Sequence, residues 1–352
     1  MKWLQDGRNI YFKYKGRDIY WTVPQDCKLK DIHPDALSLI KKLLFLPFHK
    51  DTVTKIKPKE SRVPKEGVGL SFSGGVDSTA AMLLLPENTV ASYMWRDFKS
   101  PLTHANLVKL VKAEKERKIW TVRSNHEKIR TFNGLPTGFS TDLACMTHLI
   151  LMSDYHNVGH IATGTILGSA YLYQGVYRDF STRWYWPFWS EMFRDHGFEL
   201  VMPVAGLSEV LTTKIVAQTK YRGLASACVR QTNGCKKCYK CYRKSLLLGK
   251  KIPMPKEARI FLSKKPPKHP TSSLYALQKN GITPNVCREY LTGQDYSYLD
   301  YYHPTFIQDI IPEHMRSGIE QKLQKFKCYP MDQENFEKMK SCNLKKIKKN
   351  KK

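Results

Sequence analysis

The residues best suited to chemistry lie in one glycine-rich turn, Ser73-Gly74-Gly75-Val76-Asp77-Ser78-Thr79. A short apolar run precedes this turn, and an apolar helical pattern follows it at once. The N–H groups at the start of a helix have no intrahelical partner, and the helix dipole favours an anion there. The two glycines allow the backbone to approach a ligand closely, and the hydroxyl groups add hydrogen-bond donors. The turn therefore predicts a phosphate-binding site, but not one of the Walker type, because Gly-x-x-x-x-Gly-Lys-Ser/Thr is absent.

Four cysteines form the second candidate site, with the spacing C-x6-C-x2-C-x2-C at Cys228, Cys235, Cys238 and Cys241. Four thiolates and no histidine are typical of a closed, structural zinc site, which is the interpretation we favour. An iron–sulfur cluster also takes four thiolates, and a redox dithiol needs only two. Basic residues surround the cluster and could offset the thiolate charge, reach a phosphate or simply face solvent: Arg230, Lys236, Lys237, Lys240, Arg243 and Lys244.

The elements that must position these residues alternate between strand and helix patterns. The expected strands are Val68–Phe72, Thr89–Trp95, Lys118–Val122, His160–Thr163 and Glu199–Pro203. The expected helices are Thr79–Leu85, His104–Glu116, Ser140–Asp154 and one that opens at Leu207-Ser208-Glu209, with Ser208 as its N-cap. This order predicts an α/β fold with a parallel sheet covered on both faces. Ligands of such sheets bind at the carboxyl ends of the strands.

The flanking parts of the chain carry no comparable motif. Residues 1–60 predict a small hairpin–helix module docked on the main domain, with a hairpin over Asn9–Val23 and a helix with Pro34 in its first turn. Residues 61–248 form the expected catalytic domain, which a polar linker over 55–65 would precede. Residues 249–272 read as a Pro/Lys-rich linker, 273–342 as a helical region, and 343–352 as a disordered Lys-rich tail. We expect Cys287, Cys328 and Cys342 to be packed or free.

The amino-acid composition indicates which binding partners and which cellular compartment to expect. The net charge of +27 over 352 residues favours a nucleic acid or another acidic partner, or reflects a lysine-rich composition with a solvated surface. No apolar run is long enough to cross a membrane, and the N-terminus lacks the apolar region of a signal peptide. We therefore expect a cytoplasmic protein, in which clustered cysteines hold metal rather than form disulfides.

A dense aromatic segment over residues 171–189 has three interpretations. Its rings could stack on a heterocyclic substrate, form the interface of a homodimer, or pack in the core. We favour interface or core packing over substrate stacking.

The pattern Ser-Gly-Gly-x-Asp-Ser after a strand resembles the PP-loop of the ATP pyrophosphatase superfamily, whose members cleave ATP between its α and β phosphates. The resemblance implies an adenine nucleotide alpha hydrolase-like, Rossmann-like core. It also implies that residues 73–79 bind the pyrophosphate end of ATP with Mg²⁺ nearby, and that Asp77 and Ser78 are catalytic. By position, the ends of the second and fourth strands would contact adenosine through Tyr93, Met94, Thr163, Gly164 and Thr165.

The loop, Pro203, the helix at Leu207-Ser208-Glu209 and the cysteine pattern together resemble the 7-cyano-7-deazaguanine synthase family over about Val68 to Leu248. That family, which serves queuosine biosynthesis, adenylates the carboxylate of 7-carboxy-7-deazaguanine and lets ammonia attack, and it needs no side-chain nucleophile. The loop Gly164–Tyr171 departs from the family's substrate loop. A nitrile-forming reaction and an amide-forming ligation to another molecule are therefore both consistent with the resemblance.

Two further functions fit parts of the sequence. PP-loop enzymes also adenylate tRNA bases, and the positive charge agrees with a tRNA substrate, although no recognisable tRNA-binding domain is present. A zinc-bearing nucleotide-binding protein without catalysis would bind ATP and release neither AMP nor pyrophosphate.

Overall fold

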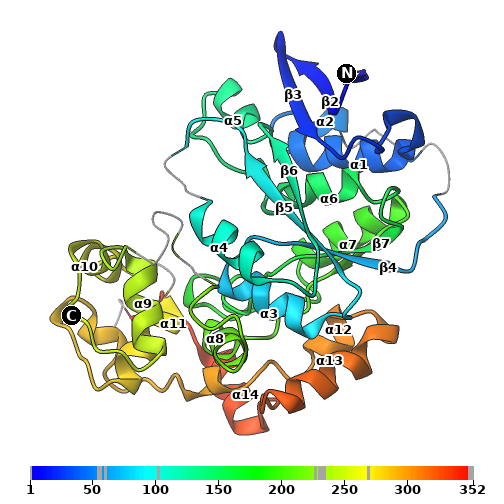
Figure 1. The fold of residues 1–352 in the computed structure, drawn as a ribbon. Coiled ribbons are helices and arrows are strands. Elements are labelled where there is room, and N and C mark those ends of the chain that lie inside the picture. Colours follow the sequence, from blue (N-terminus) through cyan, green and yellow to red (C-terminus); the bar gives the residue numbers. More distant parts are fainter. Residues whose placement is uncertain are drawn as a thin grey trace.

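The computed structural model describes residues 2–53, 58, 62–100, 104–225, 228, 235–267 and 270–347. A sheet of eight strands forms the centre, in the order β1-β2-β3-β6-β5-β4-β7-β8 (Figure 1). Strands β6, β5, β4, β7 and β8 pair in parallel, and β1, β2 and β3 join antiparallel. The strands are β1 (Trp3–Asp6), β2 (Asn9–Tyr14), β3 (Arg17–Thr22), β4 (Gly67–Ser71), β5 (Val90–Arg96), β6 (Ile119–Ser124), β7 (Val158–Ala162) and β8 (Glu199–Val201). The expected α/β fold with a mostly parallel sheet is confirmed.

Helices cover both faces of this sheet. On one face α1 packs against α6, which contacts β4 and β5; on the other α3 packs against α8 and α13 (Figure 1). The α-helices are α1 (Pro34–Phe45), α2 (Lys50–Val53), α3 (Val76–Leu84), α4 (Ala105–Ala113), α5 (Lys128–Phe132), α6 (Thr147–Leu151), α7 (Tyr185–Asp195), α8 (Glu209–Ala217), α9 (Tyr239–Leu247), α10 (Lys256–Leu262), α11 (Pro270–Lys279), α12 (Phe306–Ile310), α13 (Glu313–Lys325) and α14 (Gln333–Ser341). Short 3₁₀ helices are η1 (Leu29–Asp31), η2 (Asp142–Met146), η3 (Tyr173–Gly175), η4 (Asn285–Tyr290) and η5 (Ser297–Asp300).

The central strand β4 lies in close contact with α6. Val68 and Leu70 are buried, and a Cβ atom placed on Gly69 would lie 2.7 Å from Cδ1 of Leu149. Only glycine leaves room for that approach. Strand β4 therefore packs tightly against α6, and this contact fixes the start of the glycine-rich turn that follows β4.

The N-terminal hairpin is continuous with the central sheet. Its strands β2 and β3 turn through Lys15 and Gly16, both at positive φ, as the sequence predicts. We expected a module docked on the main domain, but β3 pairs with β6 at Trp21 and Thr22 and so extends the sheet. Trp21 is fully buried and stacks on His126 at a centroid distance of 5.6 Å, which explains why the hairpin joins the core.

Two other expectations need correction, and a third lies partly outside the described residues. The helix expected over Ser140–Asp154 is a 3₁₀ helix, η2, followed by α6. The expected linker over 249–272 contains α10 and the start of α11, because Ala258 and Leu262 are buried. Residues 55–57 and 59–61 of the expected polar linker lie outside the described residues. Beyond them, Arg62 and Lys65 both pair with Asp154 at 3.1 Å, which ties that end to the core.

The C-terminal region packs on the sheet domain as a set of helices. Cys287 and Cys328 are buried, as expected for packed cysteines. The first residues of the expected disordered tail are ordered, since Leu344 is buried and its N–H donates to the carbonyl of Gly175 at 2.9 Å. Residues 348–352 of that tail lie outside the described part of the chain. Within the described ranges, no helix is both long and apolar enough to span a bilayer.

Candidate functional site

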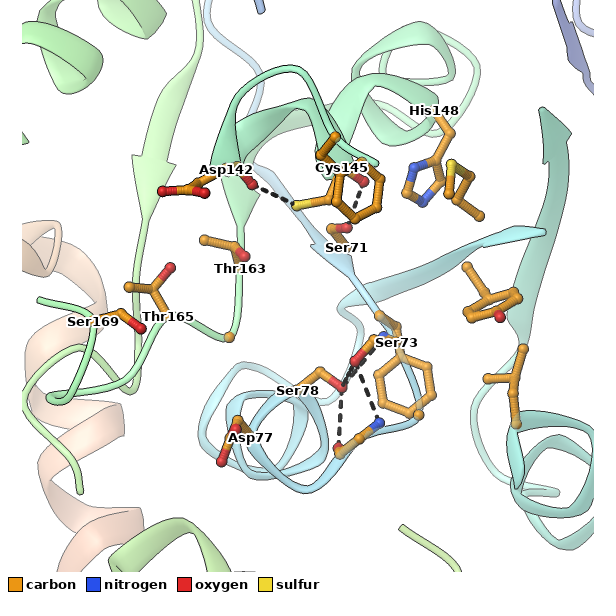
Figure 2. Close-up of a pocket in the computed structure, with 18 of the residues that line it drawn as sticks. Ser71, Ser73, Asp77, Ser78, Asp142, Cys145, His148, Thr163, Thr165 and Ser169 are labelled. Atoms are coloured by element: carbon orange, nitrogen blue, oxygen red, sulfur yellow. Dashed lines mark hydrogen bonds between the residues drawn. The ribbon is translucent and has the colours of Figure 1, made fainter. Parts of the chain in front are cut away.

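A cavity of about 950 Å³ opens at the carboxyl ends of β4, β5 and β7 (Figure 2). Strand β4 lies between β5 and β7, where the order of the parallel strands reverses, and such a switch point is where α/β sheets bind ligands. Of the predicted nucleotide-binding residues, Val76 and Thr79 do not line the cavity and the others do: Ser73, Gly74, Gly75, Asp77, Ser78, Tyr93, Met94, Thr163, Gly164 and Thr165. Val76 and Thr79 are buried within α3.

The glycine-rich turn joins β4 to α3 in a shape suited to an anion. Gly74 has a φ of +69°, and a Cβ atom there would lie 3.1 Å from Cδ1 of Leu107. Gly75 is the N-cap of α3 and offers no side chain to its first-turn N–H groups. The hydroxyls of Ser73 and Ser78 lie 2.9 Å apart, and Ser78 also donates to the carbonyl of Gly75 at 3.1 Å (Figure 2). A helix start, free amides and two hydroxyls thus meet at the cavity.

Asp77 points away from the Ser73–Ser78 pair (Figure 2) and belongs to a buried charged network. Its Oδ1 accepts a hydrogen bond of 2.7 Å from the Thr212 hydroxyl on α8. Burial raises the pKa of Asp77, and Glu209 adds to the rise, whereas Lys244 and the Thr212 hydroxyl oppose it. Asp77 is therefore held by partners that lie far away in the sequence.

The same network continues from α8 to α9. Glu209 forms an ion pair of 2.8 Å with Arg243, and both side chains are less than one-tenth exposed. Lys244 donates to the Thr213 hydroxyl at 2.7 Å, and burial lowers the pKa of its ammonium group to about 8. The sequence suggested that Arg243 and Lys244 could offset charge or reach a phosphate. It did not reveal the partners on α8, although Glu209, Thr212 and Thr213 have the three- and four-residue spacing of one helix face.

The predicted adenosine residues lie at the strand ends, as expected. Tyr93 and Met94 are nearly buried at the end of β5, and the Tyr93 hydroxyl hydrogen-bonds to Nδ1 of His104. A Cβ atom on Gly164 would lie 3.0 Å from Cα of Ser78. The loop after β7 therefore rests directly on the start of α3, which brings Thr163 and Thr165 to the same cavity.

The segment 142–148 adds lining residues that carried no motif in the sequence: Asp142, Cys145 and His148. The Cys145 thiol donates to the carbonyl of Asp142 at 3.2 Å, and burial raises its pKa to about 11. His148 donates from Nε2 to the carbonyl of Ser92 at 2.9 Å, and burial lowers its pKa to about 4. At pH 7 the thiol is therefore protonated and the imidazole uncharged, so Cys145 supplies no thiolate nucleophile and His148 no positive charge.

The aromatic segment divides between core and cavity. Tyr171 and Trp189 are buried, as core packing predicts, whereas Trp184 is 68% exposed. Four rings of the segment line the cavity: Tyr173, Phe180, Trp184 and Tyr185. The guanidinium of Arg178 lies 4.6 Å from the centre of the Tyr173 ring and also lines the cavity. A flat ligand with an acidic group could contact both, while a homodimer through residues 171–189 stays a prediction.

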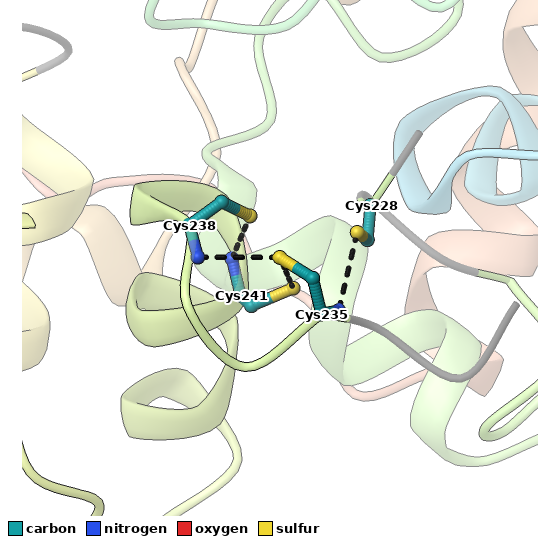
Figure 3. A group of neighbouring side chains, drawn as sticks. All are labelled: Cys228, Cys235, Cys238 and Cys241. Atoms are coloured by element: carbon teal, nitrogen blue, oxygen red, sulfur yellow. Dashed lines mark hydrogen bonds between the residues drawn. The ribbon is translucent and has the colours of Figure 1, made fainter. Parts of the chain in front are cut away.

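The four predicted cysteines come together (Figure 3). Their sulfur atoms all lie within 4.8 Å of one another, and the Cys235 and Cys241 sulfurs are 3.9 Å apart. Backbone N–H groups of Cys235, Cys238 and Cys241 point at neighbouring sulfurs at 3.2–3.4 Å, and Lys236 adopts a positive φ in the turn. This donor set fits a metal ion held by four thiolates. Arg230, also noted beside the cluster, lies outside the described residues.

The cysteine cluster adjoins the cavity, because Cys228 is a member of the cluster and also lines the cavity. Residues 188–343 match the model of a family described as "Family of unknown function (DUF6395)". The match begins within α7 and includes the cysteines and the C-terminal helices, but it excludes the glycine-rich turn. No curated protein matches the chain.

Proposed function

We propose that this chain is an ATP-dependent enzyme that releases AMP and pyrophosphate while it activates a carboxylate or similar oxygen of a planar heterocyclic substrate. The proposal places it among PP-loop enzymes with the adenine nucleotide alpha hydrolase-like fold, near the 7-cyano-7-deazaguanine synthases. One observation carries it: a single cavity is lined by a phosphate-type helix start on one side and by aromatic rings with an arginine on the other.

The nucleotide side is supported by the turn and the charges behind it. The amides at the start of α3 and the hydroxyls of Ser73 and Ser78 would hold the β and γ phosphates. Asp77 is the carboxylate on this helix start and would hold Mg²⁺, which neutralises pyrophosphate charge. Lys244, with its pKa of about 8, is mostly protonated at pH 7 and adds a positive charge close to Asp77. Tyr93, Met94 and Thr163–Thr165 would then contact adenosine.

The proposed chemistry needs orientation rather than a protein nucleophile. A substrate carboxylate oxygen attacks the α phosphorus, and the bond to the β phosphate breaks so that pyrophosphate leaves with the electron pair. Ammonia or an amine then attacks the acyl carbon, loses a proton and expels AMP, which leaves an amide. The neutral state of Cys145 and His148 agrees with this scheme, because the chain's part is to position reactants and exclude water.

The substrate side supports a flat acid as the activated molecule. Tyr173 and Trp184 present exposed rings at the cavity, and a stacked base is worth about 1–3 kcal/mol per ring. Arg178 lies beside them and could pair with a carboxylate. The first acid to test is 7-carboxy-7-deazaguanine.

The cysteine cluster supports a structural zinc ion in this proposal. Cys228, Cys235, Cys238 and Cys241 would hold it as a closed site, which fixes the start of α9. That helix carries Arg243 and Lys244 to the network around Asp77. An iron–sulfur cluster is the alternative, and measuring the zinc and iron content of the purified protein distinguishes the two.

The test is a turnover assay with purified protein, MgATP and a panel of flat heterocyclic acids, with ammonium or amines as acceptors. We expect AMP and pyrophosphate in equal amounts, and an adenylated acid detected by high-resolution mass spectrometry. Substrate-dependent release of ADP and phosphate would refute the proposal. ATP binding without AMP under any of these conditions would instead favour a non-enzymatic nucleotide-binding protein.

The net charge of +27 favours a second candidate, an enzyme that adenylates a base in tRNA. This alternative predicts salt-dependent tRNA binding and a tRNA-dependent rise in AMP release. If tRNA does not change ATP turnover, the alternative fails and the small-acid proposal stands.

A further inference from the structure

A second group of potential metal ligands lies on the edge of the sheet, outside the cavity. His160 on β7 is directly opposite Glu199 on β8, and Nε2 of His160 lies 3.0 Å from Oε2 of Glu199. His314, the second residue of α13, brings its ring to a centroid distance of 4.7 Å from that of His160. One ligand atom from each residue lies within 4.8 Å of the other two. Three elements that are distant in the sequence thus converge on one point.

This group is separate from the nucleotide cavity. His160 precedes the cavity-lining Thr163 by three residues, or about 10 Å along an extended strand. None of the three residues lines the cavity. Nor do they take part in the cysteine cluster, which comes from other segments. The group therefore has no part in the reaction proposed above.

The donor set matches a divalent transition metal. Two imidazoles, which are borderline ligands, together with one carboxylate suit Zn²⁺, Co²⁺ or Ni²⁺, whereas Mg²⁺ and Ca²⁺ prefer oxygen alone. At the metal–ligand distances of about 2.0–2.2 Å usual for Zn²⁺, neighbouring ligand atoms in a tetrahedron lie about 3.4 Å apart. The side chain of His160 is only 13% exposed and is the most restrained of the three. Glu199 and His314 are exposed, so their side chains can rotate to bring the ligand atoms from within 4.8 Å to this separation.

We propose that His160, Glu199 and His314 bind one divalent transition-metal ion, with water at the fourth position. The ion joins the edge strand β8 and its neighbour β7 to the first turn of α13. One face of this helix is already buried through Met315, Ile319 and Leu323. The metal ion would therefore add coordination bonds to an existing apolar contact. With only three protein ligands, partly exposed, this site binds more weakly than four cysteines.

The test is a Co²⁺ titration of untagged, purified protein whose cysteine cluster is already loaded with its metal. We expect one further Co²⁺ per chain with visible ligand-field bands and without the thiolate charge-transfer band that cysteine ligation gives. Metal binding should also slow amide hydrogen exchange at the start of α13, because the ion holds that turn to the sheet. This readout does not depend on any enzymatic activity.

His314→Gln and Glu199→Gln each remove an exposed ligand, and we expect at least a tenfold loss of Co²⁺ affinity with an unchanged circular dichroism spectrum. Glu313→Gln is the matched control, since Glu313 is the exposed neighbour of His314 and lies outside the group. It should bind Co²⁺ as the wild type does. Two outcomes would overturn the proposal: no additional Co²⁺ bound by the wild type at millimolar concentration, or equal affinity in the wild type and His314→Gln.

Discussion

Replacing Arg243 by methionine should destabilise the protein strongly, because the change leaves the Glu209 carboxylate buried without its ion-pair partner. The two groups lie 2.8 Å apart and their side chains are only 8% and 9% exposed. Breaking a buried pair on one side costs about 3–5 kcal/mol of unfolding free energy. A domain's total stability is about 5–15 kcal/mol, so this loss is a large part of it. The loss of stability should be greater here because Glu209 also lies near the carboxylate of Asp77. The negative charge of Glu209 disfavours the ionised form of Asp77, and without Arg243 less positive charge offsets this repulsion.

The assay is urea unfolding of protein with equal metal content, followed by circular dichroism. For a slope of about 3 kcal/mol per molar urea, a loss of 3 kcal/mol lowers the midpoint by about 1 M. Lys240→Met, an exposed lysine on the same helix, is the control and should change stability little. The double variant Arg243→Met/Glu209→Gln should recover part of the loss. A cost below about 1 kcal/mol for Arg243→Met, or strictly additive single changes, would refute the buried-pair argument.

Four further predictions follow from the site. Asp77→Asn or Ser78→Ala should suppress AMP formation while the circular dichroism spectrum stays native, because in the proposed function these residues bind the nucleotide and its Mg²⁺. Purified protein should contain about one zinc per chain, and Cys238→Ser should lose it with a lower melting temperature. The wild type should gain stability relative to Lys244→Met as pH rises from about 8 towards 10.5, because in that window the unfolded lysine is protonated and the folded one is not. Trp184→Ala should raise KM for the acid roughly five- to 150-fold if its ring stacks on substrate, from about 1–3 kcal/mol per stacked base.

Matched variants make these predictions decisive. Ser263→Ala and Tyr329→Ala alter exposed residues outside the cavity and should leave AMP formation and KM unchanged. AMP formation at the wild-type rate in Asp77→Asn would remove the proposed role of the turn. Iron in place of zinc would identify the cluster as iron–sulfur. Parallel stability curves for the wild type and Lys244→Met would contradict a buried, partly deprotonated lysine.

The sequence predicted best where the determinants are local. The turn at Ser73–Ser78 combines a short apolar strand, two glycines and a helix start, and the structure forms these elements in that order. The hairpin around Lys15 and Gly16 and the N-cap at Ser208 are also local, and both are present. The cysteine spacing predicted a cluster because two of its intervals are only three residues long.

Prediction of local structure from the sequence failed where the burial of a single apolar residue orders a segment whose composition is typical of a linker or a disordered tail. Proline and lysine suggested a linker over 249–272 and a disordered tail from 343, yet Leu262 and Leu344 are buried there. The Thr212–Asp77 hydrogen bond joins residues 135 positions apart, and no periodicity reveals such a pair. The aromatic segment has no clear pattern either, because some of its rings pack in the core and others line the cavity, in no regular order.

The arrangement of α3, α8 and α9 links the cysteines to the glycine-rich turn through a series of polar contacts. Cys238 caps α9, and Arg243 and Lys244 on the same helix reach Glu209 and Thr213 on α8. Thr212 on α8 in turn holds Asp77 at the start of α3. A metal at the cysteines would fix the first turn of α9, and each further step is a buried or partly buried polar contact that tolerates little displacement. Metal occupancy would therefore set the position of the charges behind the glycine-rich turn, without any contact between the metal and the nucleotide that we propose binds there.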